Sequence, residues 1–262
     1  MTILLSELLA GADFADNQFR AEIPEGWMQG RTTYGGLTAA LCFEAAQRAA
    51  PDAPPLRSAN FAFVGPAGGA VEARADILRQ GRSMSFIDVL LSCDGAPAAR
   101  ATFAFGAERP SHFDTEWRPA PALPKPDDCE EYIPRGLGPA FLRHLEMRLA
   151  KGSRPATGAT ENEIILWARH IDETARGPAA LLALADAPPP AVLPMFPHFK
   201  PISTATWSVN MLSDNLESPD GWYLLSSTAE GARHGYSAQD MAIWTSAGDL
   251  IVTGKQTIAI FV

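Results

Sequence analysis

Two stretches of the sequence, SFIDVLLSCDGAPAARATFAF at residues 85–105 and SAQDMAIWTSAGDLIVTGKQTIAIF at residues 237–261, follow the same pattern. Each consists of two apolar runs separated by a short turn that contains a glycine, which is typical of a β-hairpin. We interpret them as two copies of one structural unit. A chain of 262 residues is long enough for two such units of ordinary domain size.

The two copies differ at one informative position. When Gly95 is placed on Gly248, Phe103 coincides with Gln256. Because side chains alternate along a strand, Gln256 shares its face with residues 250, 252, 254, 258 and 260, which are Leu, Val, Gly, Ile and Ile. A buried amide without a partner costs roughly 1–3 kcal/mol. We therefore expect Gln256 to bond to a backbone group, a water molecule or a substrate.

In each half a helix precedes four strands. Residues 37–49 (LTAALCFEAAQRA) and 178–186 (PAALLALAD) predict two mostly buried helices. Strands are expected at 57–64, 71–79, 83–92 and 98–105, and again at 204–212, 222–228, 236–244 and 250–261. Two further strands, 141–150 and 162–171, are expected before the second helix. This order predicts an α+β fold in which each antiparallel sheet wraps around its helix and the two sheets join into one.

A segment rich in proline and charge lies between the two halves. It has no sustained hydrophobic period, so we expect a linker that runs over the surface. The expected organisation is an N-terminal unit at 1–108, the linker at 109–135 and a C-terminal unit at 136–262.

Composition excludes several classes of function. The net charge of −9 argues against a nucleic-acid-binding surface, which requires a basic patch. The three cysteines and five histidines show no metal-ligand spacing, so neither a metal nor a cofactor is expected. No apolar run is long enough to cross a membrane, and residues 1–6 (MTILLS) lack the basic start of a signal peptide. The expected location is the cytoplasm, with the cysteines reduced.

Several polar residues lie where a ligand site would need them. Tyr34, Gly35 and Gly36 directly precede the first helix, where free backbone N–H groups stabilise a developing negative charge; a simple tight turn is the alternative. Asp186 lies at the end of the otherwise apolar second helix and is either a general base or a capping residue. Glu44 is its approximate counterpart in the first helix.

Two strands also carry polar side chains at corresponding places. Ser208 lies on the polar face of the strand at 204–212, and Asn60 lies on the corresponding face of the strand at 57–64. These faces either contribute to a binding site or are simply solvated.

Four motifs together resemble the acyl-CoA thioesterase II family, whose fold is a double hotdog. They are YGGLTAAL at 34–41, LRSANFAFVGP at 56–66, LRQGRSMS at 78–85, and the C-terminal hairpin from GYS at 235–237 through IWTSAGDLIVTGKQ at 243–256. The resemblance covers nearly the whole chain except the linker. It implies hydrolysis of acyl-CoA, with the acyl chain between helix and sheet and no metal or cofactor.

The resemblance also implies site residues. In that family an Asp, a Thr or Ser, and a Gln of the second hotdog hold the attacking water. The Gln corresponds to Gln256 and the hydroxyl residue to Thr228, but the Asp position corresponds to Ser208, which cannot act as a carboxylate base. Asp186, similar to the helix-borne acid of single-hotdog thioesterases, is one replacement, and Glu230 is another if its side chain turns inward.

The expected substrate-binding residues are Tyr34, Gly35, Gly36 and Asn60, with Tyr34 at the place of a histidine in the simpler enzymes. The main alternative is a non-catalytic module that binds acyl-CoA or an acyl carrier, which the serine at position 208 favours. A hotdog hydratase ranks last because no histidine lies in a His–Asp motif. Hotdog sheets commonly pair through their edges, so a homo-oligomer is expected.

Overall fold

The computed structural model describes residues 3–134 and 136–261. The ends of the expected units at residues 1, 135 and 262 lie outside these ranges. Its helices are α1 (Leu5–Ala10), α2 (Gly35–Ala49) and α3 (Gly177–Ala185), with 3-10 turns at Glu25–Trp27, Pro126–Asp128, Ala140–His144 and Leu193–Met195. No helix in the described ranges is both long enough and apolar enough to span a membrane.

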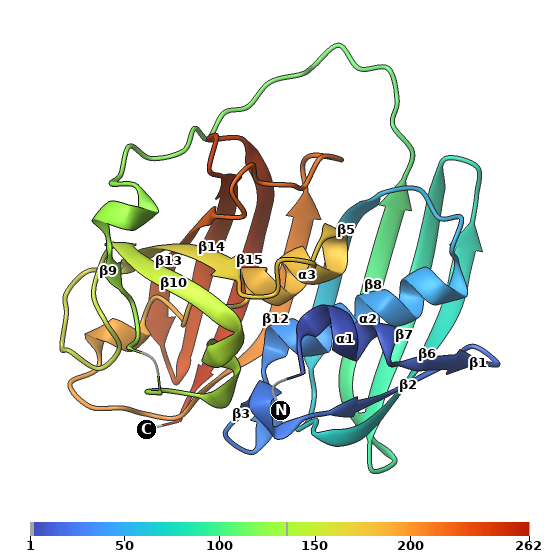
Figure 1. The fold of residues 1–262 in the computed structure, drawn as a ribbon, viewed down its shortest axis with the longest axis horizontal. Coiled ribbons are helices and arrows are strands. Elements are labelled where there is room, and N and C mark those ends of the chain that lie inside the picture. The colour runs from blue at the N-terminus through green and yellow to red at the C-terminus, as the bar shows by residue number, and fades with distance from the viewer. Residues whose placement is uncertain (1–2, 135, 262) are drawn as a thin grey trace.

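The strands form one continuous antiparallel sheet and one small pair (Figure 1). In the first half the sheet contains β1 (Asp13–Ala15), β2 (Gln18–Ile23), β5 (Leu56–Phe63), β6 (Gly69–Gln80), β7 (Met84–Cys93) and β8 (Ala96–Gly106). In the second half it contains β9 (Glu130–Glu131), β10 (Leu145–Lys151), β11 (Glu163–His170), β12 (Ile202–Met211), β13 (Tyr223–Arg233), β14 (Tyr236–Thr245) and β15 (Leu250–Ile260). The small pair consists of β3 (Met28–Gln29) and β4 (Thr32–Thr33).

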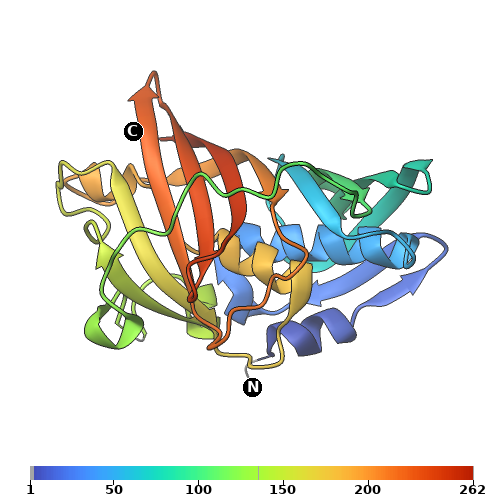
Figure 2. The same ribbon diagram turned by 90° about the horizontal axis from the view of Figure 1, so that it is seen from above.

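The sheet order is β1-β2-β6-β7-β8-β5-β12-β15-β14-β13-β11-β10-β9. The two halves meet where β5 pairs with β12, and Phe61 lies directly opposite Trp207 there. Viewed from above, the sheet curves around the helices, which lie on its inner side (Figure 2). The predicted double hotdog with one extended sheet is confirmed.

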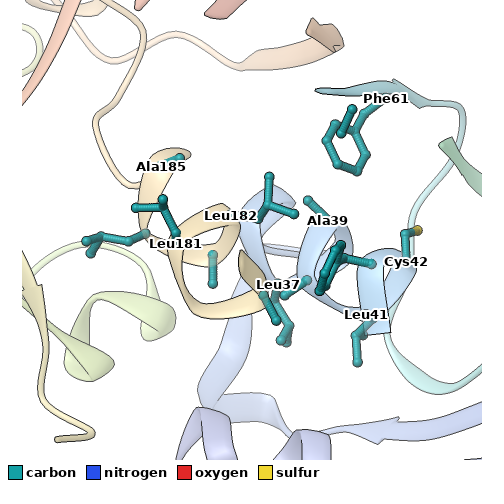
Figure 3. Packing of buried hydrophobic residues seen from close by; sticks show 14 of the residues in the cluster. Leu37, Ala39, Leu41, Cys42, Phe61, Leu181, Leu182 and Ala185 are labelled. Carbon is teal, nitrogen blue, oxygen red and sulfur yellow. The ribbon is translucent and has the colours of Figure 1, made fainter. Parts of the chain in front are cut away.

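The helices pack against each other and against the inner face of the sheet (Figure 3). Seven of the nine residues of α3 are buried, and α2 buries ten of its fifteen. Alanines and leucines dominate both helices, and small side chains allow two helices to approach the sheet closely. Leu37 and Leu182 are fully buried.

The two hairpins of the repeated pattern have the same register. Ile87 lies opposite Phe103 in the first hairpin, and Gln239 lies opposite Gln256 in the second. Both turn glycines have a positive φ, +76° at Gly95 and +101° at Gly248, which side chains with a Cβ rarely adopt. The equivalence of Phe103 and Gln256 is therefore a structural fact.

One expected strand begins later than the pattern indicated. Residues 140–144 form a 3-10 turn, and β10 starts only at Leu145. Pro139 precedes the turn with φ −67°, and its carbonyl accepts a hydrogen bond from the Leu142 N–H at 3.2 Å. The fixed φ of proline favours such a turn, which the apolar pattern of these residues does not show.

The segment between the halves lies against the outer face of the second half. The Trp167 indole N–H donates to the Pro124 carbonyl at 2.8 Å, and the Trp244 indole N–H donates to the Arg118 carbonyl at 2.9 Å. Cys129 is buried in the same outer cluster. The segment thus covers an apolar part of the sheet.

Candidate active site

Asp186 follows directly after the last residue of α3 and is half-buried. Its carboxylate faces β15, where the Gln256 side-chain amide donates to Asp186 Oδ1 at 2.7 Å. Gln256 points to the inner face because it lies opposite Trp207, which is buried in the core. The Gln256 amide, for which the sequence predicted a hydrogen-bonding partner, therefore bonds to a carboxylate.

A second glutamine fixes the orientation of the first. The Gln239 amide donates to Gln256 Oε1 at 2.8 Å, and Gln239 Oε1 accepts from the Ala191 N–H at 2.9 Å. Each amide thus has a defined oxygen side and a defined nitrogen side. Because Gln256 Oε1 is held by Gln239, the Gln256 NH₂ group faces Asp186.

The N-terminus of α2 closes the other side of the carboxylate. The Gly36 N–H donates to Asp186, in line with the positive end of a helix attracting an anion. A Cβ added at Gly35 would lie 2.6 Å from Asp186 Oδ2. Only a glycine at position 35 therefore leaves the carboxylate in its place.

Tyr34 has a structural position beside this cluster. Its ring is buried and stacks on Phe141 with centroids 4.0 Å apart. Its hydroxyl donates to the Ala183 carbonyl in α3. Tyr34 thereby connects the start of α2 to the end of α3.

The surroundings change the acidity of Asp186. Burial raises its pKa to about 7, although the hydrogen bonds from Gln256 and Gly36 oppose this rise. Burial, and secondarily the neighbouring Asp186, raises the pKa of Tyr34 well above its usual value. A carboxyl group that titrates near neutrality is suited to proton transfer, and such groups concentrate at functional sites.

The other expected polar residues lie on the opposite, outer face of the sheet. Ser208 is adjacent in β12 to the inward-facing Trp207 and pairs with Asn60 and Lys255. Asn60 is exposed. A surface depression of about 410 Å³ lies at this place, lined in part by Asn60, Ser208 and Lys255.

Thr228 and Glu230 also lie outside the cluster. The Thr228 hydroxyl contacts Glu163 Oε1 at 3.4 Å, and Thr228 lies opposite the partly exposed Asp240. Glu230 forms an ion pair with Lys255 at 2.9 Å. The structure therefore brings together Gln256, Asp186, Gly35 and Gly36, and separates them from Ser208, Thr228, Asn60 and Glu230.

Gln239 was not expected from the sequence. It was detectable, because a hairpin with its turn at Gly248 pairs β14 with β15 and places residue 239 opposite residue 256. Two glutamines facing each other on an otherwise apolar surface are a stronger signal than either alone.

Two sequence models of acyl-CoA thioesterase domains match the chain. The model of the N-terminal domain matches residues 23–106, and that of the C-terminal domain matches residues 118–260. The chain belongs to the acyl-CoA thioesterase family. The Asp186–Gln256 contact lies within the C-terminal domain of this family, and Gly35 and Gly36 lie within its N-terminal domain.

Solved structures have the same fold over the full length. A conserved protein of unknown function with a hot dog fold from Alicyclobacillus acidocaldarius is 25% identical, with TM-score 0.89 and coverage of 100% of this chain and 99% of that one. A TesB protein from Mycobacterium avium subs paratuberculosis is 16% identical, with TM-score 0.82 and 98% of both chains covered. The acyl-CoA thioesterase II TesB2 from Mycobacterium marinum is 17% identical, with TM-score 0.78 and 98% of both chains covered. None of the curated proteins matches the sequence.

Proposed function

We propose that this protein hydrolyses acyl-CoA thioesters, with Asp186 as the general base. Membership in the acyl-CoA thioesterase family supports thioester hydrolysis in general. The observation that carries the residue assignment is the contact of Asp186 with both the Gln256 amide and the Gly36 N–H. It joins a base, an amide donor and a helix N-terminus at one point.

The reaction needs a base and a site for developing negative charge. The ionised Asp186 removes a proton from a water molecule, whose oxygen attacks the thioester carbonyl carbon. The resulting oxyanion collapses, the carbon–sulfur bond breaks, and the CoA thiolate takes up the proton that Asp186 received. Free acid and CoA are the products, and the carboxylate is regenerated.

The residues around Asp186 have separate tasks in this proposal. One N–H of the Gln256 amide holds Asp186, and its second N–H is available to a water or a carbonyl oxygen. The first turn of α2 supplies the positive end of a helix for the oxyanion. Gly35 and Gly36 allow the thioester to approach this backbone closely.

The alternative of a non-catalytic binding module has less support. It rested on serine at position 208, but Ser208 lies on the outer face of the sheet, away from Gln256. A carboxylate is present on the inner face, and its pKa of about 7 leaves it largely ionised in mildly alkaline solution. This arrangement favours turnover over binding alone.

The experiment that tests the function is release of the CoA thiol from a panel of short, long and aromatic acyl-CoA thioesters. Gln256→Ala removes the donor to Asp186, and we expect kcat/KM to fall about 10²–10³-fold. Thr257→Ala is the matched control, because Thr257 neighbours Gln256 but is exposed on the outer face, and its activity should stay within twofold. Equal activity of wild type and Gln256→Ala would refute the site, and no release from any thioester would refute the function.

The pH profile provides a second test. Asp186 must be ionised to accept a proton, so log kcat/KM should rise with a slope of about one up to a pH near 7 and then level off. A profile that stays flat from pH 5 to pH 8 would exclude Asp186 as the base.

A further inference from the structure

Four buried rings join the two halves of the chain. We call this set the ring joint: Trp27 and Tyr34 come from the first half, and Phe141 and His144 come from the second. Tyr34 stacks on Phe141 with ring centroids 4.0 Å apart, and Trp27 stacks on His144 with centroids 3.7 Å apart. Both pairs are nearly parallel, at 1° and 9° respectively. Aromatic pairs prefer defined relative geometries, so the two stacks fix one half against the other.

The two stacks are held to each other by hydrogen bonds and by a shared turn. In the first half, the Tyr34 N–H donates to the Trp27 carbonyl at 3.2 Å. In the second half, Phe141 and His144 lie three residues apart in one 3-10 turn, where residues i and i+3 share a side. The His144 Nε2–H donates to the Gly26 carbonyl at 3.1 Å, which ties this turn to the first half. A shift of one stack therefore displaces the other.

One ring of the joint lies directly on the α2 N-terminus. Tyr34 precedes Gly35, the first residue of α2. A Cβ added at Gly36 would lie 2.6 Å from Cζ of the Tyr34 ring. The Gly36 N–H in turn donates to Asp186. Because the ring packs directly against the glycine, a displacement of Tyr34 also displaces the N–H group that faces the carboxylate.

Phe141 reaches the site through Tyr34. The described hydrogen bonds of the Asp186 carboxylate come from Gln256 and Gly36, and Tyr34 is the titratable group beside it. Burial, and secondarily Asp186, raises the pKa of Tyr34 well above its usual value, so this hydroxyl stays neutral while Asp186 titrates. Phe141 itself carries no polar group. Its ring therefore acts on Asp186 by packing and not by charge.

We propose that Phe141 is a positioning residue, which holds Tyr34 and thereby keeps the first turn of α2 against Asp186. A site built from two halves needs such a contact, since Asp186 belongs to one half and Gly36 to the other. The second stack of the ring joint supports it, because this stack fixes the 3-10 turn from which the Phe141 ring projects. The assignment rests on the proposed hydrolysis of acyl-CoA with Asp186 as the base.

Loosening the ring joint should change both the rate and the pH profile. Misplacement of a reacting group by about 1 Å costs up to about 10²-fold in rate. Water that enters beside a displaced Tyr34 also hydrates the Asp186 carboxylate. Burial is the largest cause of the raised pKa of Asp186 and outweighs the opposing Gly36 hydrogen bond, so partial hydration lowers that pKa. A ring that only fills space would lower the melting temperature without moving the pH profile.

The core of the first half supplies a matched control. Phe105 is fully buried, and its ring centroid lies 6.2 Å from that of Phe43 and 6.3 Å from that of Phe103. It belongs to neither stack of the ring joint. Phe105→Leu removes the same atoms as Phe141→Leu, so the two variants should lose similar melting temperature and differ in their effect on the site.

The test is a double-mutant cycle on acyl-CoA hydrolysis. For Phe141→Leu we expect kcat to fall roughly tenfold, KM to stay within about twofold, and log kcat/KM to rise at a lower pH than in wild type. Phe105→Leu should keep kcat within about twofold and leave the profile in place. Tyr34→Leu should lower kcat at least as much as Phe141→Leu. Adding Phe141→Leu to Tyr34→Leu should cause no further loss, because Phe141 acts through Tyr34.

The proposal would be overturned by additive losses in the double variant, by equal losses of kcat in Phe141→Leu and Phe105→Leu, or by a pH profile that does not move. If Phe141→Leu does not fold, Phe141→Met takes its place, since methionine fills irregular core space. If no thioester is hydrolysed, the proposed function fails, and NMR titration of the Asp186 carboxyl carbon decides on the ring joint. A lower midpoint in Phe141→Leu but not in Phe105→Leu would then support the joint, and one midpoint in all three proteins would refute it.

Discussion

The inner faces of the two equivalent hairpins carry opposite kinds of side chain. In the second half, Gln239 and Gln256 form an amide pair that reaches Asp186. In the first half, Ile87 and Phe103 occupy the same register and are fully buried. The rings of Phe103 and Phe43 pack edge to face, with their centroids 5.8 Å apart. One half uses this position for a polar site, and the other uses it for the core.

The ends of the two helices differ in the same way. Asp186 and Glu44 each lie nine positions after the first glycine of their helix, at Gly177 and Gly35. Glu44 pairs with Arg48 within its own helix at 2.8 Å, whereas Asp186 has no cationic partner among the described residues. The acid of the first half is thus neutralised by a cation of its own helix, whereas the acid of the second half contacts an amide.

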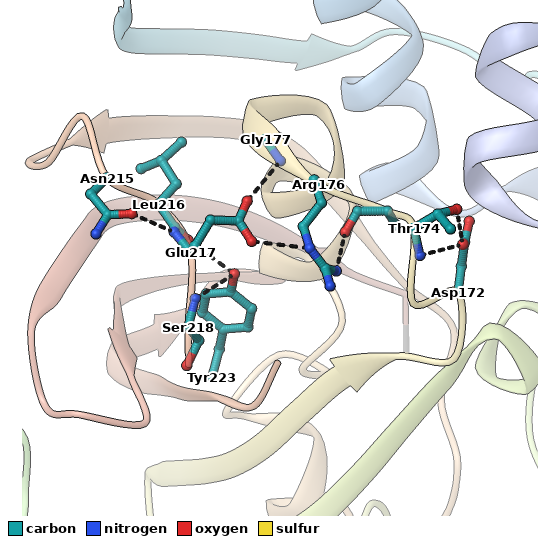
Figure 4. A network of polar contacts seen from close by, with 10 residues as sticks. Asp172, Thr174, Arg176, Gly177, Asn215, Leu216, Glu217, Ser218 and Tyr223 are labelled. Atoms are coloured by element: carbon teal, nitrogen blue, oxygen red, sulfur yellow. Dashed lines mark hydrogen bonds and ion pairs between the residues drawn. The ribbon is translucent and has the colours of Figure 1, made fainter. Parts of the chain in front are cut away.

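The helix N-termini complete the comparison. At α2 the Gly36 N–H meets Asp186, in a buried setting. At α3 the Gly177 N–H faces Glu217 Oε1 at 3.4 Å, and Glu217 also pairs with Arg176 at 3.2 Å (Figure 4). This second pair is largely exposed. Of the two helix N-termini compared, among the described residues only that of α2 meets both an acid and a side-chain amide, at the C-terminal end of α3.

The sharpest way to test this asymmetry is to neutralise each acid in turn. Asp186→Asn removes the base, and we expect kcat/KM for acyl-CoA to fall about 10²–10⁴-fold. Glu44→Gln, at the equivalent position, should stay within twofold of wild type. Steady-state kinetics with circular dichroism as a folding check would decide, and comparable losses in both variants would remove the distinction between the halves.

A second test introduces the polar side chain into the first half. Phe103→Gln places an amide among Ile87, Phe43 and Phe105, where no described polar side chain is available to bond to it. Lost packing and an unpaired amide should lower the free energy of unfolding by roughly 3–5 kcal/mol, without a gain in activity. Chemical denaturation measures the loss, and a change below about 1 kcal/mol would show that this position tolerates polarity.

A smaller effect is expected from the glycine that faces the acid. In Gly35→Ala, the new Cβ would lie 2.6 Å from Asp186 Oδ2, so the carboxylate must move. A displacement of about 1 Å of a reacting group costs up to about 10²-fold in rate, and we expect a tenfold to hundredfold loss in kcat. Unchanged kcat in a folded Gly35→Ala protein would show that the site adapts. Gly231→Ala, where an added Cβ meets nothing within 4 Å, is a control for the loss of a glycine alone.

The last test concerns the dependence of stability on pH. Asp186 has a pKa of about 7 in the folded protein, above its value of 3.8 in the unfolded chain. The free energy of unfolding therefore falls as the pH rises from about 4 to about 7, because the Asp186 carboxyl ionises less readily in the folded protein than in the unfolded chain. Asp186→Asn should lack this loss and melt at a higher temperature than wild type at pH 8. Parallel melting curves of the two proteins between pH 5 and pH 8 would contradict the raised pKa.

Much of the fold was predictable because it depends on local pattern. The hairpin turns at Gly95 and Gly248, the two apolar helices and the alternation that marked Gln256 are all visible in short windows of sequence. The departure at residues 140–144 has a local cause too, since Pro139 starts a turn that apolar periodicity does not reveal.

The site was only partly predictable. Alternation showed that Gln256 needs a partner, but it did not show whether Asp186, Ser208, Thr228 or Glu230 lies beside it. Thr228 and Glu230 failed to join it because the side chains of β13 at these positions point outward, and a bulge between Ala229 and Gly231 shifts the register there. A local sequence pattern predicts that a strand exists. Which of its side chains point inward depends on its register with the neighbouring strands and on which face of the sheet is buried.

The sequence by itself determined two repeated units, a buried helix in each, and a lone polar residue at position 256 where the other copy has phenylalanine. Only the tertiary structure decided that Asp186 of one half meets Gly36 of the other, with Gln239 orienting the amide between them. The physical reason is that helix packing joins residues 36 and 186, far apart in the chain. No local periodicity of the sequence predicts such a contact. It forms because burial and hydrogen bonding across the interface of the two halves stabilise it.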